Sequence, residues 1–159
     1  IYGYGGRSFA IMDGNSGKII YDSGNDIAVR TAFTGFFNWN EDAGSFDDRS
    51  DDKGAEPEAI TVGEIDGKTF AFVGLERQGG IMMYDITGII KPKFVGYFNG
   101  RNFFGDGTKM TGGDISPESL VFIPADKTPP AYKALNNGPL LIGAYELSGS
   151  TAVYQISNN

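Results

Sequence analysis

The chain has 159 residues, the length of one ordinary domain, and 40% of them are hydrophobic, which is enough to form a core. A net charge of −7 and a pI near 4.5 argue against nucleic-acid binding, and no apolar run approaches the length of a membrane span. Because the sequence contains neither Cys nor His, it excludes disulfides, thiolate or histidine zinc sites, and a Ser-His-Asp mechanism.

Three segments of the chain share one pattern: FAIMDGNSGKIIYD (9–22), FVGLERQGGIMMYD (72–85) and IGAYELSGSTAVYQ (142–155). Each has an apolar run, an acid, a turn rich in Gly or Ser, a second apolar run and a tyrosine. The acids are Asp13, Glu76 and Glu146, and the tyrosines are Tyr21, Tyr84 and Tyr154. Because Gly-rich turns between apolar runs are typical of hairpins, the pattern predicts a β-hairpin repeated three times.

Further apolar runs extend the middle hairpin to four predicted strands, at 58–65, 69–76, 80–87 and 93–98, with a tight turn at Asp66-Gly67. Repeated four-stranded antiparallel units that pack face to face are the blades of a β-propeller. A β-sandwich is the alternative, but it would not explain the repeat. The prediction is therefore an all-β fold, a β-propeller fragment of about two and a half four-stranded antiparallel blades.

The predicted units are a partial blade at 1–36, a blade at 57–99 and a partial blade at 117–157. The first unit lacks an innermost strand, and the last unit stops after its third strand. Unpaired strand edges favour completion by other strands. We therefore expect residues 1–159 to be the C-terminal part of a larger β-propeller. Their partner would be the remainder of that propeller, either another segment of the protein or another chain.

Strand parity predicts which end of the sheets carries each loop. It places the acidic loop 41–58, the loop 99–118 and the turns 13–17, 76–80 and 146–150 on one face. The turn at 66–67 and the loop 124–138 fall on the opposite face.

Six carboxylates crowd into residues 45–60 on the first of these faces. They are Asp47, Asp48, Asp51, Asp52, Glu56 and Glu58. Calcium binds six to eight oxygen ligands and suits such a face, whereas a solvated acidic loop and a catalytic site are the alternatives. Glu58 and Glu118 are expected to start innermost strands, and Glu76 and Glu146 to end second strands on this face. Arg49, Arg77 and Arg101 would either pair with these carboxylates or clamp a phosphate.

The segment FDDRSDDKGAEPEAITVGEIDGKTFAFVGLERQGGIMMYDIT (46–87) closely resembles the bacterial choice-of-anchor I domain proteins. It is also similar to the related mesenchyme-specific cell-surface glycoproteins of animals. The resemblance continues through GRSFAIMD, YDSG, GDISPESLVFIPA and ELSGSTAVYQI. It implies a propeller that is extracellular, periplasmic or at the cell surface. Animal members are associated with biomineralisation, and some bacterial relatives are labelled alkaline phosphatases or phytase-like.

Carried over by position, the acidic and Pro-Glu motifs of the family fall on Asp48, Asp51, Asp52, Glu56, Glu58, Asp114, Glu118 and Glu146. Together with Glu76 these residues are the candidate ligands of Ca²⁺. The chain departs from the family where Ala59 and Ser119 replace the Gly after each Pro-Glu, and where Tyr145 replaces an Asn. It also has no Asn-x-Ser/Thr sequon, so the glycoprotein aspect does not transfer.

Two hypotheses about function follow. The first is an extracellular calcium-binding propeller that acts as a binding or matrix module. The second is a calcium-dependent phosphoesterase, in which Arg49, Arg77 or Arg101 would bind the phosphate and a carboxylate-held metal would activate water.

Overall fold

The computed structural model describes residues 6–41, 46–133 and 138–157, which form three antiparallel sheets. The first sheet pairs β1 (Ala10–Met12) with β2 (Ile19–Asp22). The second has the order β3 (Pro57–Ile65), β4 (Lys68–Leu75), β5 (Ile81–Asp85) and β6 (Lys93–Phe98). The third has the order β7 (Pro117–Ile123), β8 (Leu140–Tyr145) and β9 (Ser150–Gln155).

Short helices lie in the connections between strands, and the sequence pattern did not predict them. They are α1 (Asp26–Thr31), η1 (Gly107–Lys109), η2 (Ala125–Lys127) and α2 (Pro130–Lys133). α1 follows the first sheet and packs on the second, because Ile27 is buried there and Tyr84 of β5 donates a hydrogen bond to Asp26. The helices belong to loops, so the described chain is an all-β structure.

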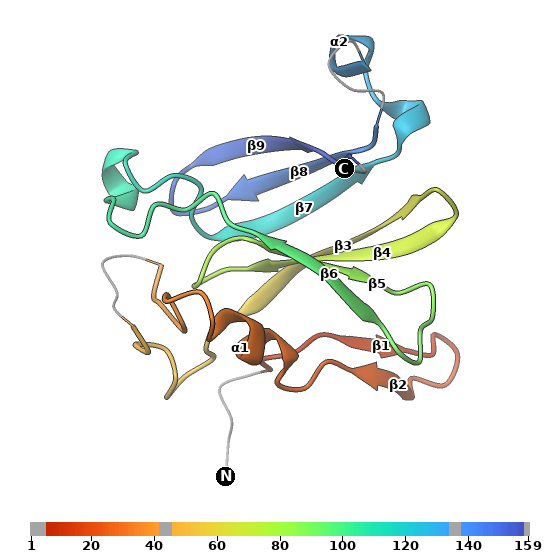
Figure 1. The fold of residues 1–159 in the computed structure, drawn as a ribbon, viewed down its shortest axis with the longest axis horizontal. Helices are drawn as coiled ribbons and strands as arrows, with labels where there is room; N and C mark the ends of the chain where they lie inside the picture. Colours follow the sequence, from red (N-terminus) through yellow and green to blue (C-terminus); the bar gives the residue numbers. More distant parts are fainter. Residues whose placement is uncertain (1–5, 42–45, 134–137, 158–159) are drawn as a thin grey trace.

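The three sheets are stacked one above another, as Figure 1 shows, and side chains fill the two spaces between them. The core between the first and second sheets contains Phe9, Ile27, Ala55, Val73, Leu75, Met82 and Tyr84. The core between the second and third contains Ala59, Phe72, Ile81, Leu120 and Leu141. Within the described ranges the sheets close into neither a barrel nor a ring, so the fold is a β-propeller fragment, as predicted.

The four predicted strands of the middle blade are confirmed within one or two residues. The turn between the first two has positive φ at both central residues, 51° at Asp66 and 74° at Gly67. A two-residue hairpin turn of this kind matches the right-handed twist of its strands, and Asp-Gly supplies the required backbone conformations. The sequence signal at this turn therefore has a direct physical basis.

The predicted alignment of the first hairpin is wrong. Arg7, just before β1, donates hydrogen bonds to the backbone carbonyls of Ser50 and Asp52, so β1 starts at the acidic end of the sheets. The turn 13–17 consequently lies at the opposite end (Figure 1). β1 and β2 thus run like β5 and β6, the third and fourth strands of a blade.

Turns of the same type follow β1 and β5, which supports this alignment. Oδ1 of Asp13 accepts the N–H of the residue two positions on, Asn15, and Oδ1 of Asp85 at the end of β5 does the same with Thr87. Both acids therefore belong to turns of the same kind at the same end of a blade. Asp13 lies away from Glu76 and Glu146, contrary to the prediction.

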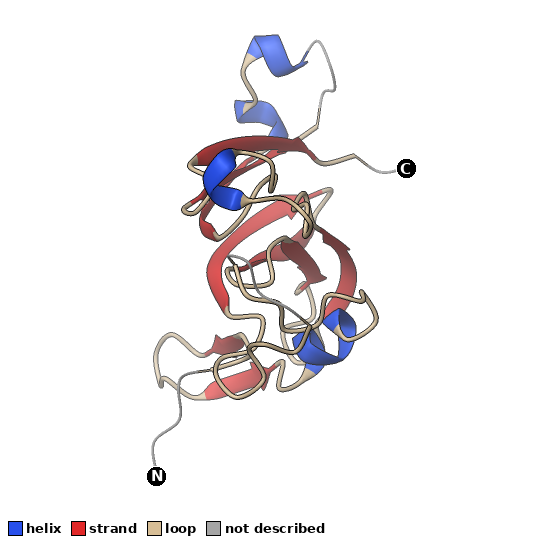
Figure 2. Cartoon of the chain, turned by 90° about the vertical axis from the view of Figure 1, so that its left-hand side faces the viewer, coloured by secondary structure: helices blue, strands red, loops and turns tan. Residues whose placement is uncertain are grey.

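The remaining loops and turns lie at the ends of the sheets that strand parity predicts. The turn 66–67 and the described part of the loop 124–138 lie at one end of the sheets, and the turns 76–80 and 146–149 lie at the other end with the loop 99–116 (Figure 1). Residues 42–45 and 134–137 of the two long loops lie outside the described residues. Figure 2 looks directly onto the acidic end, where α1, η1 and the long connections face the viewer.

Candidate metal centre

The second and third sheets build the same local structure at their acidic ends. Glu58 and Glu118 each follow a proline at the start of an inner strand, at an irregularity in the pairing with the next strand. Glu76 and Glu146 come directly after β4 and β8. An extra residue at such a bulge re-aims a side chain, and this geometry brings the acids of one sheet together.

Matching backbone hydrogen bonds show that the acidic ends of the second and third sheets have the same local structure. The N–H of Glu76 donates to the carbonyl of Glu56, and the N–H of Glu146 donates to the carbonyl of Ser116, both at 2.8 Å. Glu56 and Ser116 both have positive φ, 57° and 63°, immediately before the proline. The same unusual backbone therefore positions the carboxylates in both sheets.

The carboxylates form two groups that share Glu76. One group is Glu56, Glu58 and Glu76, and the other is Glu76, Glu118 and Glu146. In each group one oxygen from every residue lies within 4.8 Å of the others. Calcium–oxygen distances are about 2.3–2.6 Å, so two ligands of one ion are at most about 5 Å apart. Each group is thus compact enough for a single cation.

Basic side chains neutralise the first group. Arg77 contacts Glu41, lies 3.2 Å from Glu56 through Nε and 2.9 Å from Glu76 through Nη1. Glu56, which is 3% exposed, also pairs with Arg49 at 2.9 Å and with Lys53. In the described part of the chain, no Lys or Arg forms an ion pair with Glu118 or Glu146. The second group therefore has the larger uncompensated negative charge.

The pKa values of the acids reflect this crowding. Burial raises the pKa of Glu76 to about 7, and a hydrogen bond with Glu58 adds to the increase, while the charge of Arg77 opposes it. Burial also raises the pKa of Glu118, with contributions from Glu146 and Glu58. Because burial and neighbouring carboxylates disfavour ionisation, Glu76 and Glu118 retain their protons to higher pH than isolated acids would.

Glu41 connects the loop that follows the first sheet to residues of the third sheet. The hydroxyl of Ser116 donates to Oε2 of Glu41 at 2.7 Å. Nη2 of Arg101 donates to the carbonyls of Asn40 and Glu41, at 2.6 and 3.0 Å. Sequence reasoning missed both Glu41 and Lys53, and the only signal available was their place in the acidic loop.

Several predicted ligands lie outside both groups. Asp48 and Asp51 are exposed, and Asp52 pairs with Arg49 at 2.8 Å. Asp114 accepts hydrogen bonds from Ser150 at 2.7 Å and from Tyr154 at 3.1 Å. Among the nine candidates, the structure brings together Glu56, Glu58, Glu76, Glu118 and Glu146.

The three arginines that the sequence suggests for phosphate binding have protein partners. Arg49 and Arg77 pair with carboxylates, and Arg101 is buried and donates to backbone carbonyls, including that of Arg77 at 2.7 Å. The contacts of Arg49 and Arg77 match the alternative of pairing with carboxylates.

Stacked antiparallel sheets with a carboxylate cluster at one end define an all-β, propeller-type module. A comparison with known families matches residues 1–89 to the Choice-of-anchor I domain, and the chain belongs to this family. Membership makes it a surface or extracellular module.

The chain is also similar to Gigasin-3a of Magallana gigas, with 26% identity over 171 residues. The similarity covers 98% of this chain but 57% of Gigasin-3a, so the chain spans little more than half of that relative. No solved structure matches it. None of the helices in the described ranges has the length and apolar composition that crossing a bilayer requires.

Proposed function

We propose that the chain is part of an extracellular or cell-surface β-propeller that binds Ca²⁺ and acts as a binding or matrix module. The observation that carries the proposal is the group formed by Glu76, Glu118 and Glu146, whose oxygens lie within 4.8 Å of one another. These three acids come from two neighbouring sheets, and among the described residues only Glu76 has a basic ion-pair partner, Arg77.

Electrostatics supports a cation at this position. Two carboxylates at that separation repel each other by roughly 3 kcal/mol at the effective dielectric constant of a protein surface. A divalent ion would replace this repulsion with attraction to all three acids. Calcium fits better than magnesium because its coordination is flexible and tolerates carboxylates on separate strands, with water completing the sphere.

Isothermal titration calorimetry and thermal unfolding with calcium or chelator test the proposal. Calcium at a hundred times its Kd should stabilise the protein by about 2.7 kcal/mol through mass action. Glu118→Gln and Glu146→Gln should abolish this stabilisation. As a matched control, Asp48→Asn changes an exposed acid outside both groups and should leave it intact. A melting temperature that is the same in calcium and in chelator would reject the proposal.

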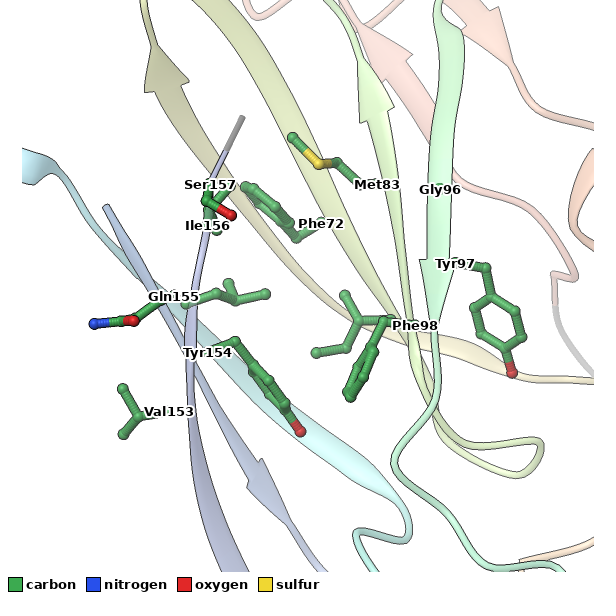
Figure 3. Close-up of a pocket in the computed structure, with 12 residues that line it drawn as sticks. Phe72, Met83, Gly96, Tyr97, Phe98, Val153, Tyr154, Gln155, Ile156 and Ser157 are labelled. Carbon is green, nitrogen blue, oxygen red and sulfur yellow. The ribbon is translucent and has the colours of Figure 1, made fainter. Parts of the chain in front are cut away.

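We further propose that residues 1–159 form the C-terminal part of a larger propeller and that the rest of it covers the third sheet. β6 pairs with the outer side of β5, but within the described ranges no strand pairs with the outer side of β9. Beside β9 lies an apolar groove of about 560 Å³. Phe98 of β6 and Tyr154 of β9 face each other across it, whereas Tyr97 points to the other side of β6 (Figure 3).

A fourth strand of the third sheet, supplied by the same protein, would pair with β9 and cover this groove. The greater length of Gigasin-3a supports this assignment. Hydrogen exchange tests it: the β9 amides should be protected in the intact protein and should exchange rapidly in a chain limited to residues 1–159. Equal protection in both would contradict the assignment.

The phosphoesterase hypothesis stays a prediction from the family resemblance. No contact described above favours it, since the arginines on this face bond to the protein itself.

A further inference from the structure

Arg77 occupies a special place at the acidic end of the sheets. It follows Glu76 in the turn between β4 and β5, and its guanidinium contacts Glu41, Glu56 and Glu76. Its side chain is 22% exposed, so the charge is largely enclosed by these three carboxylates. An arginine remains protonated at all physiological pH values, which makes this a permanent positive charge.

The third sheet has the same backbone but a different residue at this position. Glu146 is equivalent to Glu76, and the residue that follows Glu146 is Leu147. Leu147 packs towards Gly107 in the neighbouring loop, where a Cβ on that glycine would lie 3.2 Å from Cδ2 of the leucine. A cation therefore follows Glu76, and an apolar side chain follows Glu146. Arg77 bonds to two acids of the first group and touches the second group through the shared Glu76.

Open space lies beside Glu118 and Glu146, the two acids of the second group that form no ion pair with a Lys or Arg in the described part of the chain. A shallow hollow beside β8 and β9 is lined by Glu118, Ala144, Tyr145, Glu146, Gly149, Ser150 and Thr151. It offers carboxylates and hydroxyls to an ion and its water ligands. In the first group, by contrast, the guanidinium already bonds to two of the three acids.

We propose that Arg77 is the built-in cation of the Glu56–Glu58–Glu76 group and limits this end of the protein to one calcium ion, held by Glu76, Glu118 and Glu146. A second ion among Glu56, Glu58 and Glu76 would lie against a fixed positive charge, which repels it. This inference rests on the proposed function, because it assigns the position and number of the ions whose binding is proposed above.

Calorimetric titration of the intact protein with CaCl2 tests the inference through stoichiometry. The wild-type protein should bind one ion at this end. Arg77→Leu should bind two, because it removes the guanidinium that bonds to both Glu56 and Glu76. Leu147→Arg should weaken binding at least 30-fold, because it places a cation beside Glu146. Arg30→Leu is the control. Arg30 pairs with Asp26 on α1, so its replacement should leave both the stoichiometry and the affinity of calcium binding unchanged.

Two uncharged replacements of similar shape keep the test decisive if Arg77→Leu fails to fold. Glu58→Gln removes the charge of an acid that is not a ligand of the proposed ion and leaves a side chain that can still hydrogen-bond Glu76, so it should alter the Kd less than threefold. Glu118→Gln changes a ligand of that ion and should raise the Kd at least 30-fold. Two ions bound to the wild-type protein, or equal effects of these two variants, would overturn the inference alone. No calcium binding to the wild-type protein would overturn the proposed function and this inference with it.

Discussion

The hydroxyl of Ser116 donates a 2.7 Å hydrogen bond to Oε2 of Glu41, and the two residues are 75 positions apart in the chain. Ser116 is fully buried at the start of β7, while Glu41 belongs to the loop that follows the first sheet. This hydrogen bond therefore links the loop that follows the first sheet to the start of the third sheet.

Ser116→Ala should destabilise the protein by about 1–2 kcal/mol, because it removes a hydrogen bond to a charged group and leaves the carboxylate less satisfied. Urea unfolding measures the change. A double-mutant cycle with Glu41→Gln should give a coupling energy of about 1 kcal/mol. Ser119→Ala, at an exposed position on the same strand, is the control and should have little effect. Additive effects of Ser116→Ala and Glu41→Gln would show that the bond contributes nothing.

A second bond docks α1 on the middle sheet. The hydroxyl of Tyr84, a residue that is 1% exposed, donates to Oδ2 of Asp26 at 2.9 Å. Tyr84→Phe keeps the ring that packs against Phe9 and removes this bond together with a weak 3.5 Å bond to Sδ of Met82, so we expect a loss of about 1 kcal/mol in chemical denaturation. Tyr132→Phe, on a partly exposed residue of α2, is the matched control. If both variants were equally stable, α1 would not depend on this contact.

The raised pKa of Glu76 predicts how stability depends on pH in the metal-free protein. The folded state holds a proton on Glu76 up to about pH 7, whereas the unfolded chain releases it near 4.5. Between these values the folded state binds more protons, so stability should decrease as pH rises from about 4.5 to about 7. Thermal unfolding across this range in chelator measures the slope, and Glu76→Gln should flatten it. A slope of equal size in the variant would assign the effect to other groups.

The strands of the middle blade could be predicted because turn chemistry and apolar runs mark them locally. Asp66-Gly67 requires two positive φ values, and only a few residue pairs supply them. The register of the first hairpin could not be predicted in the same way. Its acid-and-turn pattern fits both β4–β5 and β5–β6, and the contact that decides between them, Arg7 with Ser50, lies far away in sequence.

The same division applies to the candidate site. Strand parity found Glu58, Glu76, Glu118 and Glu146, because alternating strand direction alone places them at one end of the sheets. Asp114 did not join them, because Ser150 and Tyr154 of β9 reach its carboxylate, and no sequence spacing reports such a contact. The residues that neutralise the site depend on tertiary contacts, so they became visible only in the structure.

A glycine between the second and third sheets gives a sharp test of their stacking. A Cβ on Gly63 of β3 would lie 2.4 Å from the ring of Phe122 on β7, and that ring stacks on Phe72 with centroids 5.8 Å apart. Gly63→Ala should therefore destabilise the protein by about 1–3 kcal/mol, as overpacking does, measured by guanidinium unfolding. In Gly96→Ala, the matched control on β6, the new methyl meets no atom within 4 Å. Phe122→Leu should restore part of the loss in Gly63→Ala, because it makes room for the methyl. If Gly63→Ala and Gly96→Ala were equally stable, the two sheets would not pack as closely as described.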